Sequence, residues 1–144
     1  MKKIILIFVV VLFSCSKEDS NEERDVAVTP NAFFGYWYYK QDTKTDGTVI
    51  LNINECSTKR DALELKSNFS AVEHNYNSSC VDVGLQDLVY TLITTNTGEN
   101  YLDFGGNYDN FKIIKLTNKT IYLEYEFLLL SGETELRTRV YTKE

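Results

Sequence analysis

Apolar and polar positions alternate along most of the chain with the two-residue period of a β-strand. The clearest case is the run Ile-Tyr-Leu-Glu-Tyr-Glu-Phe at 121–127, in which the odd-numbered positions are aliphatic or aromatic and the last two even-numbered positions are glutamates. The segments 49–54 and 62–66 alternate in the same way. This pattern indicates strands that bury one face and expose the other.

Residues that favour strands fill these segments, and residues that favour turns separate them. Tyr, Phe, Ile, Val, Leu and Thr dominate the strand-like runs, as pleated surfaces prefer. Gly, Asn, Asp and Ser lie between the runs. We therefore expect nine strands, at 35–41, 48–55, 62–67, 69–76, 87–95, 100–104, 111–117, 120–129 and 133–142.

Helical signals are few. Thr29-Pro30 is typical of a helix start, because proline is favoured at the first helical position, and predicts a single turn over 30–34. A helical turn over 57–63, with Ser57 as its cap, competes with the neighbouring strands. Short strands joined mostly by tight turns predict an all-β fold: an antiparallel up-and-down β-barrel of about 8–9 strands, with a β-sandwich as the alternative.

The first 14 residues read as a cleaved export signal. Lys2 and Lys3 precede an apolar run over 4–13, which is too short to span a bilayer and matches the core of a secretory signal. Leu12-Phe13-Ser14-Cys15 then supplies a lipobox-like ending. A cysteine thiolate is the nucleophile that accepts a diacylglyceryl group, so we expect lipidation of Cys15. The alternative is an ordinary signal peptide that contains a cysteine.

A polar, acidic stretch follows Cys15 and predicts a flexible tether over 15–31, with the folded domain at 32–144. Removing Lys2 and Lys3 with the signal leaves 13 basic residues against 21 acidic ones, a net charge of −8. Nucleic-acid binding needs a basic surface, so this balance argues against it. Acidic chains are also repelled by anionic lipids, so we expect attachment to the membrane through the acyl chains on Cys15.

The three cysteines limit the possible pairings. If Cys15 is acylated, Cys56 and Cys80 remain as an even pair in an oxidising compartment, and they predict a disulfide. Two buried free thiols are the alternative. We expect no metal site, because His74 is the only histidine and has no companion ligand nearby in the sequence.

A Gly-x-Trp sequence, Gly35-Tyr36-Trp37, opens the first expected strand just after the possible helical turn. Cys56 precedes a Leu-x-Leu segment at Leu63 and Leu65, Cys80 follows it, and the last strand ends in Tyr-x-Lys at 141–143. In these features the region 32–144 resembles the lipocalin-like domains of small lipoproteins from Gram-negative bacteria. The resemblance implies a barrel whose closed end is covered by Trp37, with Gly35 beside it and a guanidinium from Arg137 or Arg139 stacked on the indole.

The resemblance also implies a location on the outer membrane, at its periplasmic face or at the cell surface. The acidic stretch after Cys15 resembles the signals that send some lipoproteins to the outer face of this membrane. An eight-stranded barrel is either filled by side chains or holds one small ligand. We expect six residues to point inward and to line any cavity: Leu63, Leu65, Tyr90, Leu92, Leu123 and Tyr125.

Two functions follow from the sequence. The first is binding of a small apolar ligand inside the barrel. The second is a structural or protein-interaction module with a filled barrel and an exposed apolar or aromatic patch at one rim. We expect a monomer with no cofactor and no enzymatic activity, because the sequence shows no nucleophile motif, and we expect His74 to face solvent or a loop.

Overall fold

The computed structural model describes residues 22–105 and 110–144. The predicted signal at 1–14, Cys15 and the first part of the predicted tether lie outside the described residues. The described elements are α1 (Pro30–Phe33), β1 (Gly35–Lys44), β2 (Val49–Leu51), β3 (Ala62–Leu65), β4 (Ser70–His74), β5 (Leu88–Val89), β6 (Thr91–Thr94), β7 (Asn100–Asp103), β8 (Phe111–Leu116), β9 (Thr120–Leu128) and β10 (Thr134–Thr142).

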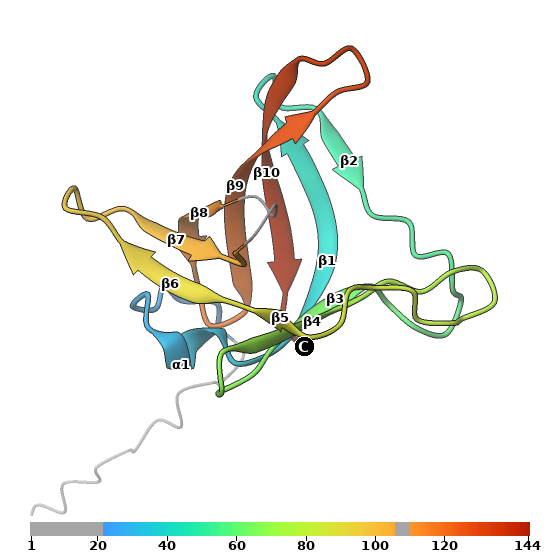
Figure 1. Ribbon diagram of the computed structural model, residues 1–144, viewed down its shortest axis with the longest axis horizontal. Helices are drawn as coiled ribbons and strands as arrows, with labels where there is room; N and C mark the ends of the chain where they lie inside the picture. Colours follow the sequence, from blue (N-terminus) through green and yellow to red (C-terminus); the bar gives the residue numbers. More distant parts are fainter. Residues whose placement is uncertain (1–21, 106–109) are drawn as a thin grey trace, which may run out of the picture.

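Nine strands follow one antiparallel path in the order β5-β4-β3-β1-β10-β9-β8-β7-β6, and β2 pairs with β1 beside this path (Figure 1). The two ends of the path, β5 and β6, are separated in the chain by Tyr90 alone. The sheet therefore curls into a nearly closed barrel with one seam. The prediction of an all-β antiparallel barrel is confirmed, and α1 occupies the predicted position of the helical turn.

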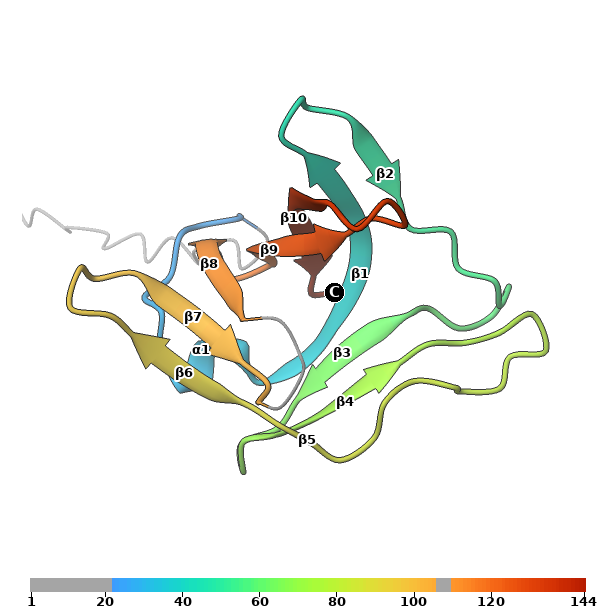
Figure 2. The same cartoon turned by 45° about the horizontal axis from the view of Figure 1, so that its top comes forward.

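The seam lies where one strand was predicted at 87–95. This segment splits into β5, which pairs with β4, and β6, which pairs with β7. Between them, Tyr90 donates its backbone N–H to the Phe69 carbonyl at 2.9 Å and its hydroxyl to the Lys66 carbonyl at 3.0 Å. Figure 2 shows β4 and β6 diverging from this junction. The strand divides because its two halves pair with strands on opposite sides of the seam.

The hydrophobic core fills the end of the barrel next to α1. Phe33 of α1 and Trp37 of β1 are both completely buried, and the Trp37 indole N–H donates to the Phe33 carbonyl at 2.5 Å. Around them the core gathers side chains from six further strands and the segments beside them: Leu63, Leu65, Ala71, Tyr90, Leu102, Phe104, Ile113, Leu116, Ile121, Leu123 and Tyr141. We call this the closed end.

Part of the predicted tether belongs to the folded domain. The Val26 N–H donates to the Leu116 carbonyl at 3.1 Å, and Asp25 forms a β-bridge with Thr117. Arg24 and Asn118 exchange two hydrogen bonds, from the Arg24 N–H to Asn118 Oδ1 and from the Asn118 N–H to the Arg24 carbonyl. These contacts fix the start of the described chain to the turn between β8 and β9, so the folded part begins earlier than residue 32.

The long strand β1 supports two different neighbours on the same edge. Its first half pairs with β3, and its second half, after a bulge between Tyr39 and Gln41, pairs with β2. The strand predicted at 48–55 is therefore much shorter than expected. The helical turn at 57–63 that competed with the expected strand does not form: the chain bends there and enters β3 at Ala62.

Candidate protein-interaction surface

The residues predicted to point inward do so. Leu63, Leu65, Tyr90 and Leu123 belong to the core, and Leu92 packs against it while partly buried. Tyr125 is also buried. It lines an open pocket of about 370 Å³ whose other walls are largely polar: Tyr101, Asn110, Lys112, Glu124, Glu126 and Leu136.

Trp37 covers the closed end as predicted, but the cation above it is not an arginine. Lys143 Nζ lies 4.2 Å from the centre of the Trp37 ring and donates to the Ala32 carbonyl at 3.2 Å. The prediction that Arg137 or Arg139 stacks on Trp37 was wrong. Both arginines lie several residues before the end of β10, so their side chains are farther from the closed end than that of Lys143. Gly35, at φ +116°, adopts a conformation that favours glycine, and Lys143 Cε lies 3.8 Å from the position of a Cβ there.

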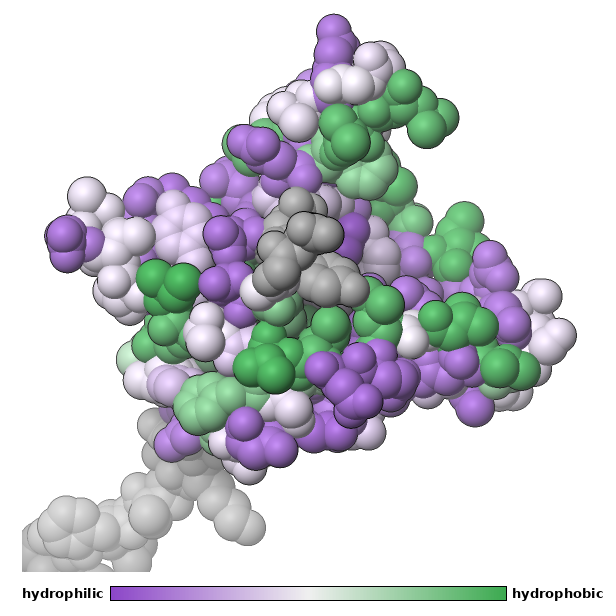
Figure 3. Space-filling model, in the orientation of Figure 1, coloured by the Kyte–Doolittle hydropathy of each residue, from purple (hydrophilic) through white to green (hydrophobic). Residues whose placement is uncertain are grey.

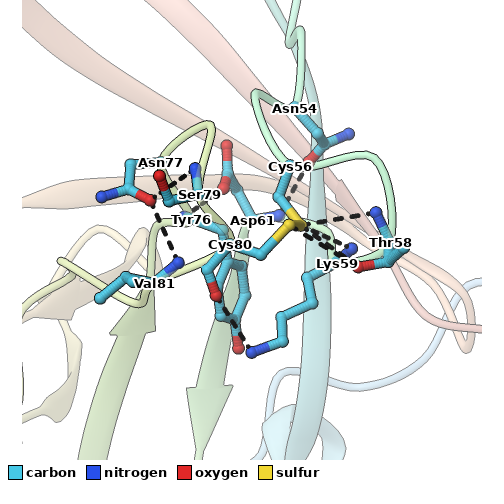
Figure 4. Close-up of a disulfide and its surroundings, with 10 residues drawn as sticks. All are labelled: Asn54, Cys56, Thr58, Lys59, Asp61, Tyr76, Asn77, Ser79, Cys80 and Val81. Atoms are coloured by element: carbon cyan, nitrogen blue, oxygen red, sulfur yellow. Dashed lines mark hydrogen bonds between the residues drawn. A yellow bond between two sulfur atoms is a disulfide. The ribbon is translucent and has the colours of Figure 1, made fainter.

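Cys56 and Cys80 form the predicted disulfide, with their Cα atoms 4.9 Å apart. Figure 4 shows how it joins the loop between β2 and β3 to the hairpin that continues β4. The backbone N–H groups of Thr58 and Lys59 point to Cys56 Sγ at 3.4 and 3.2 Å. The disulfide thus holds the connection that leaves β2.

Large apolar side chains are exposed at the end of the barrel away from α1. We call this set the apolar rim. It comprises Val49, Ile50, Leu51 and Ile53, in and just after β2, and Phe127, Leu128, Leu130 and Leu136, in the β9–β10 hairpin. Leu51 is 65% exposed, Ile53 83% and Leu128 67%. Figure 3 shows hydrophobic side chains gathered on the hairpin and β2 at the top of the molecule.

The strand pairing explains this exposure. The last pair between β1 and β10 is Lys44 with Arg137, whereas β9 and β10 continue together to the pair Leu128 with Thr134. The hairpin tip is therefore a two-stranded ribbon beyond the barrel wall. β2 pairs with β1 on one edge only. Neither segment has a second layer of the described chain against it.

A buried polar network lies beneath the rim, inside the barrel. Asp42 is only 3% exposed. Its carboxylate accepts from Arg139 Nε at 2.9 Å and Nη2 at 3.1 Å, and from the Tyr125 hydroxyl at 2.6 Å. The Arg139 guanidinium also lies over the rings of Tyr39 and Tyr125, 4.7 Å from each ring centre. The network joins β1, β9 and β10 where the apolar core has ended.

Burial, hydrogen bonds and charge in this network shift the pKa values of Asp42 and Tyr125 in opposite directions. Burial alone raises the pKa of Asp42, but the hydrogen bonds and charge of Arg139 and the hydroxyl of Tyr125 outweigh it, so the pKa lies below its usual value. Burial and the hydrogen bond to Asp42 raise the pKa of Tyr125 to about 12. At neutral pH the Asp42–Arg139 pair is therefore ionised, and the Tyr125 hydroxyl is neutral.

A second ionic group lies closer to the hairpin tip. Glu135 accepts from Lys44 Nζ at 3.0 Å and from Arg137 Nε at 2.6 Å, and the Arg137 guanidinium lies 3.6 Å from the centre of the Phe127 ring. These contacts connect the end of β1 to the hairpin. They hold the hairpin in place and leave its aliphatic side chains free.

Carboxylates surround the apolar rim. Asp46, Glu55, Glu126 and Glu133 are exposed around β2 and the hairpin, and none has a cation within ion-pair distance among the described residues. Lys44 and Arg137, by contrast, are both engaged by Glu135. The rim is therefore an aliphatic strip with a negative border.

The other described pockets are open and lined by polar groups. One, of about 260 Å³, lies at the mouth of the barrel beside Asp61, Glu73, Asn75 and Arg139. Another, of about 280 Å³, lies on the outer face of β1, β3 and β4. There His74 stacks between Tyr36 and Tyr76 and pairs with Asp82 at 2.6 Å. His74 is thus half-buried and faces the loop that follows β4, which agrees with the expectation that it faces solvent or a loop.

The sequence contained one signal for the rim. The run Phe-Leu-Leu-Leu at 127–130 precedes the Ser131-Gly132 turn, and a run of apolar residues at a turn departs from the polar composition expected there. The exposure of β2 left no such signal, because its alternation is the same as that of a buried strand.

The fold and its exposed rim define a class, an antiparallel β-barrel with an apolar surface at one end. The sequence matches no protein-family model, and comparison with curated proteins and with solved structures finds no significant match. Across residues 22–105 and 110–144, no helix is long and apolar enough to cross a membrane. Within the same ranges, no three histidine, cysteine or acidic side chains are grouped to hold a metal ion.

Proposed function

We propose that this protein is a membrane-anchored, extracytoplasmic interaction module, and that the apolar rim is its binding surface for another protein. The observation that carries the proposal is the position of eight large exposed hydrophobic side chains at one end of a small acidic barrel. A contiguous exposed apolar surface with a polar border is typical of a binding site. Scattered single residues would not have this meaning.

The start of the described chain and the apolar rim lie at opposite ends of the barrel. The described chain begins beside the turn that precedes β9, and the rim surrounds the turn that follows β9. Nine strand residues span about 27 Å. A lipid group on Cys15 would hold the first end near the membrane, so the rim would face away from it and toward soluble or neighbouring proteins.

The pockets favour this function over binding of a small apolar ligand in the barrel. The pockets beside the barrel mouth and beneath the hairpin are lined by carboxylates, amides and cations. Ligand pockets for apolar molecules are lined predominantly by hydrophobic side chains. Five of the six residues predicted to line a cavity belong to the core around Trp37 or pack against it, and only Tyr125 lines one of the described pockets.

The test compares two double variants of the full chain expressed in its own host. Leu128→Ser with Leu130→Ser removes apolar surface from the rim. Val81→Ser with Val83→Ser removes similarly exposed aliphatic surface from the disulfide-bonded hairpin and serves as the matched control. After chemical cross-linking, we expect wild type and control to retain the same specific partner and the rim variant to lose it.

Equal capture by all three proteins would contradict the proposal. So would the absence of any partner together with a small apolar molecule released from the purified protein in native mass spectrometry. That second outcome would support ligand binding in the barrel.

A further inference from the structure

The free edge of β2 offers backbone groups as well as side chains. In an antiparallel pair, alternate residues direct both their N–H and C=O groups to the partner strand, and the residues between them direct these groups away. The Lys44 N–H donates to the Thr48 carbonyl at 2.9 Å, and the Asn52 N–H donates to the Lys40 carbonyl at 2.9 Å. Asp42 pairs with Ile50 in the same register. The even-numbered residues of this segment therefore face β1.

Val49 and Leu51 consequently direct their N–H and C=O groups to the open edge, and Ile53 follows them just beyond the last hydrogen bond to β1. No described strand pairs with β2 on that side. The side chains of the same three residues are among the most exposed apolar groups of the protein. Backbone donors, backbone acceptors and aliphatic side chains are thus presented together along one edge.

Three of the usual protections of an exposed edge strand are missing from β2. Edge strands are commonly blocked by proline, by lysine or by a bulge. The segment Thr48-Val-Ile-Leu-Asn52 contains no proline and no charged residue, and the described bulges of this sheet lie in the β1–β10 and β8–β9 pairs rather than in β2. Its protection is its short length alone.

We infer that β2 binds an extended segment of a partner protein by strand addition, and that this segment carries aliphatic side chains flanked by lysine or arginine. This inference rests on the proposed function of the rim and names its mode of recognition. In strand addition, main-chain hydrogen bonds supply affinity and alternate side chains supply specificity. The new strand would continue the sheet from β9, β10, β1 and β2.

Charge complementarity identifies the flanking residues of the partner. Asp46 precedes β2 and Glu55 follows it. Neither forms an ion pair among the described residues, although the hydrogen bond from Thr48 and the charge of Lys44 lower the pKa of Asp46. A second copy of this acidic chain would place like charges against them, which is unfavourable. An aliphatic segment with basic flanking residues would pair with these carboxylates and with the free backbone groups of β2.

The probe is the synthetic peptide Lys-Thr-Val-Thr-Val-Thr-Val-Lys, and binding to the full chain is measured by fluorescence anisotropy and by amide hydrogen exchange. We expect binding to protect the amides of Val49 and Leu51 from exchange, while Ile50, already paired with β1, changes little. A peptide N-methylated on alternate residues and a peptide with glutamate in place of lysine should each bind at least tenfold more weakly.

Leu51→Pro separates the backbone from the side chain. It removes an N–H that faces the open edge, and proline is tolerated at such a position, so the Ile50–Asp42 pairing should persist. We expect it to weaken peptide binding at least tenfold, whereas Leu51→Thr, which keeps the N–H, should weaken it by a smaller factor. Val49→Pro repeats the test at the neighbouring free N–H.

The inference is overturned if the lysine-flanked peptide does not bind, or if Leu51→Pro and Val49→Pro bind it as wild type does. The proposed function fails separately. If Leu128→Ser with Leu130→Ser abolishes partner capture while the proline variants retain it, the rim is a binding surface but strand addition is not its mode. If neither pair of variants affects partner capture, both are wrong.

Discussion

The two ends of the barrel are held together by different interactions. At the closed end, Phe33, Trp37 and Leu65 are almost completely buried in a continuous apolar core. At the end that carries the apolar rim, the interior contact is an ionised pair, Asp42 with Arg139, and the apolar side chains lie outside. Core packing thus stabilises one end, whereas the other end uses polar groups inside and leaves hydrophobic groups available.

This difference separates stability from binding. Substitutions at the closed end should unfold the protein, and substitutions on the rim should leave the fold intact. Substitutions in the buried Asp42–Arg139 pair should have an intermediate effect on stability, because this pair positions the strands that carry the rim.

Trp37→Ala should have the largest effect. The side chain is fully buried against α1 and the core, and removing a large buried aromatic side chain costs about 3–5 kcal/mol. Urea denaturation monitored by circular dichroism measures this loss. A loss below about 1 kcal/mol would show that the closed end is not the main source of stability.

Asp42→Ala should cost about 3 kcal/mol, at the lower end of the range for breaking a buried ion pair. The lower value is expected because the Arg139 side chain remains 21% exposed. Exchanging both partners, as Asp42→Leu with Arg139→Met, should recover most of the loss, since an apolar pair leaves no buried charge unpaired. A double variant as unstable as Asp42→Ala would contradict this account.

Acid should weaken the rim end through the same pair. Because the folded-state pKa of Asp42 is lowered, its carboxylate contributes stability above the unfolded pKa of about 4 and loses it as the pH falls through the lower folded value. The free energy of unfolding should therefore decrease from pH 6 to pH 3. Asp42→Asn should show a smaller decrease over this interval than wild type, and an equal decrease would contradict the assignment.

Leu128→Ser should have the smallest effect on stability, within about 0.5 kcal/mol of wild type, because the side chain is exposed on a two-stranded ribbon. The matched comparison is Leu123→Ser on the same strand, where the side chain is buried and the loss should be several times larger. Similar losses at the two positions would show that the hairpin packs against something that the described contacts do not include.

The sequence predicted the closed end better than the rim. Alternation at 121–125 and the Gly35-x-Trp37 start identified buried positions, because inward-facing apolar residues are required wherever a core exists. The same alternation at 49–53 was misleading, since a strand at the sheet edge with no second layer has no buried face. The position of β2 depends on how far β1 extends beyond β3, and this is a property of the whole barrel.

Contacts between residues far apart in the sequence also differed in how well the sequence predicted them. The Cys56–Cys80 disulfide was predictable because the number of cysteines limited the choice. The cation over Trp37 is Lys143 rather than Arg137 or Arg139, because the register of β10 decides which basic residue reaches the indole. The Asp42–Arg139–Tyr125 network depends on the same register.

The apolar rim should contact another protein, whereas the rest of the exposed surface should not. The most direct measurement is photo-cross-linking in the native host, with a photoreactive amino acid placed at Leu130 on the rim or at Val81 on the disulfide-bonded hairpin, both of which are exposed. We expect a discrete cross-linked protein from position 130 and none from position 81. No product from position 130, or the same products from both positions, would contradict the claim.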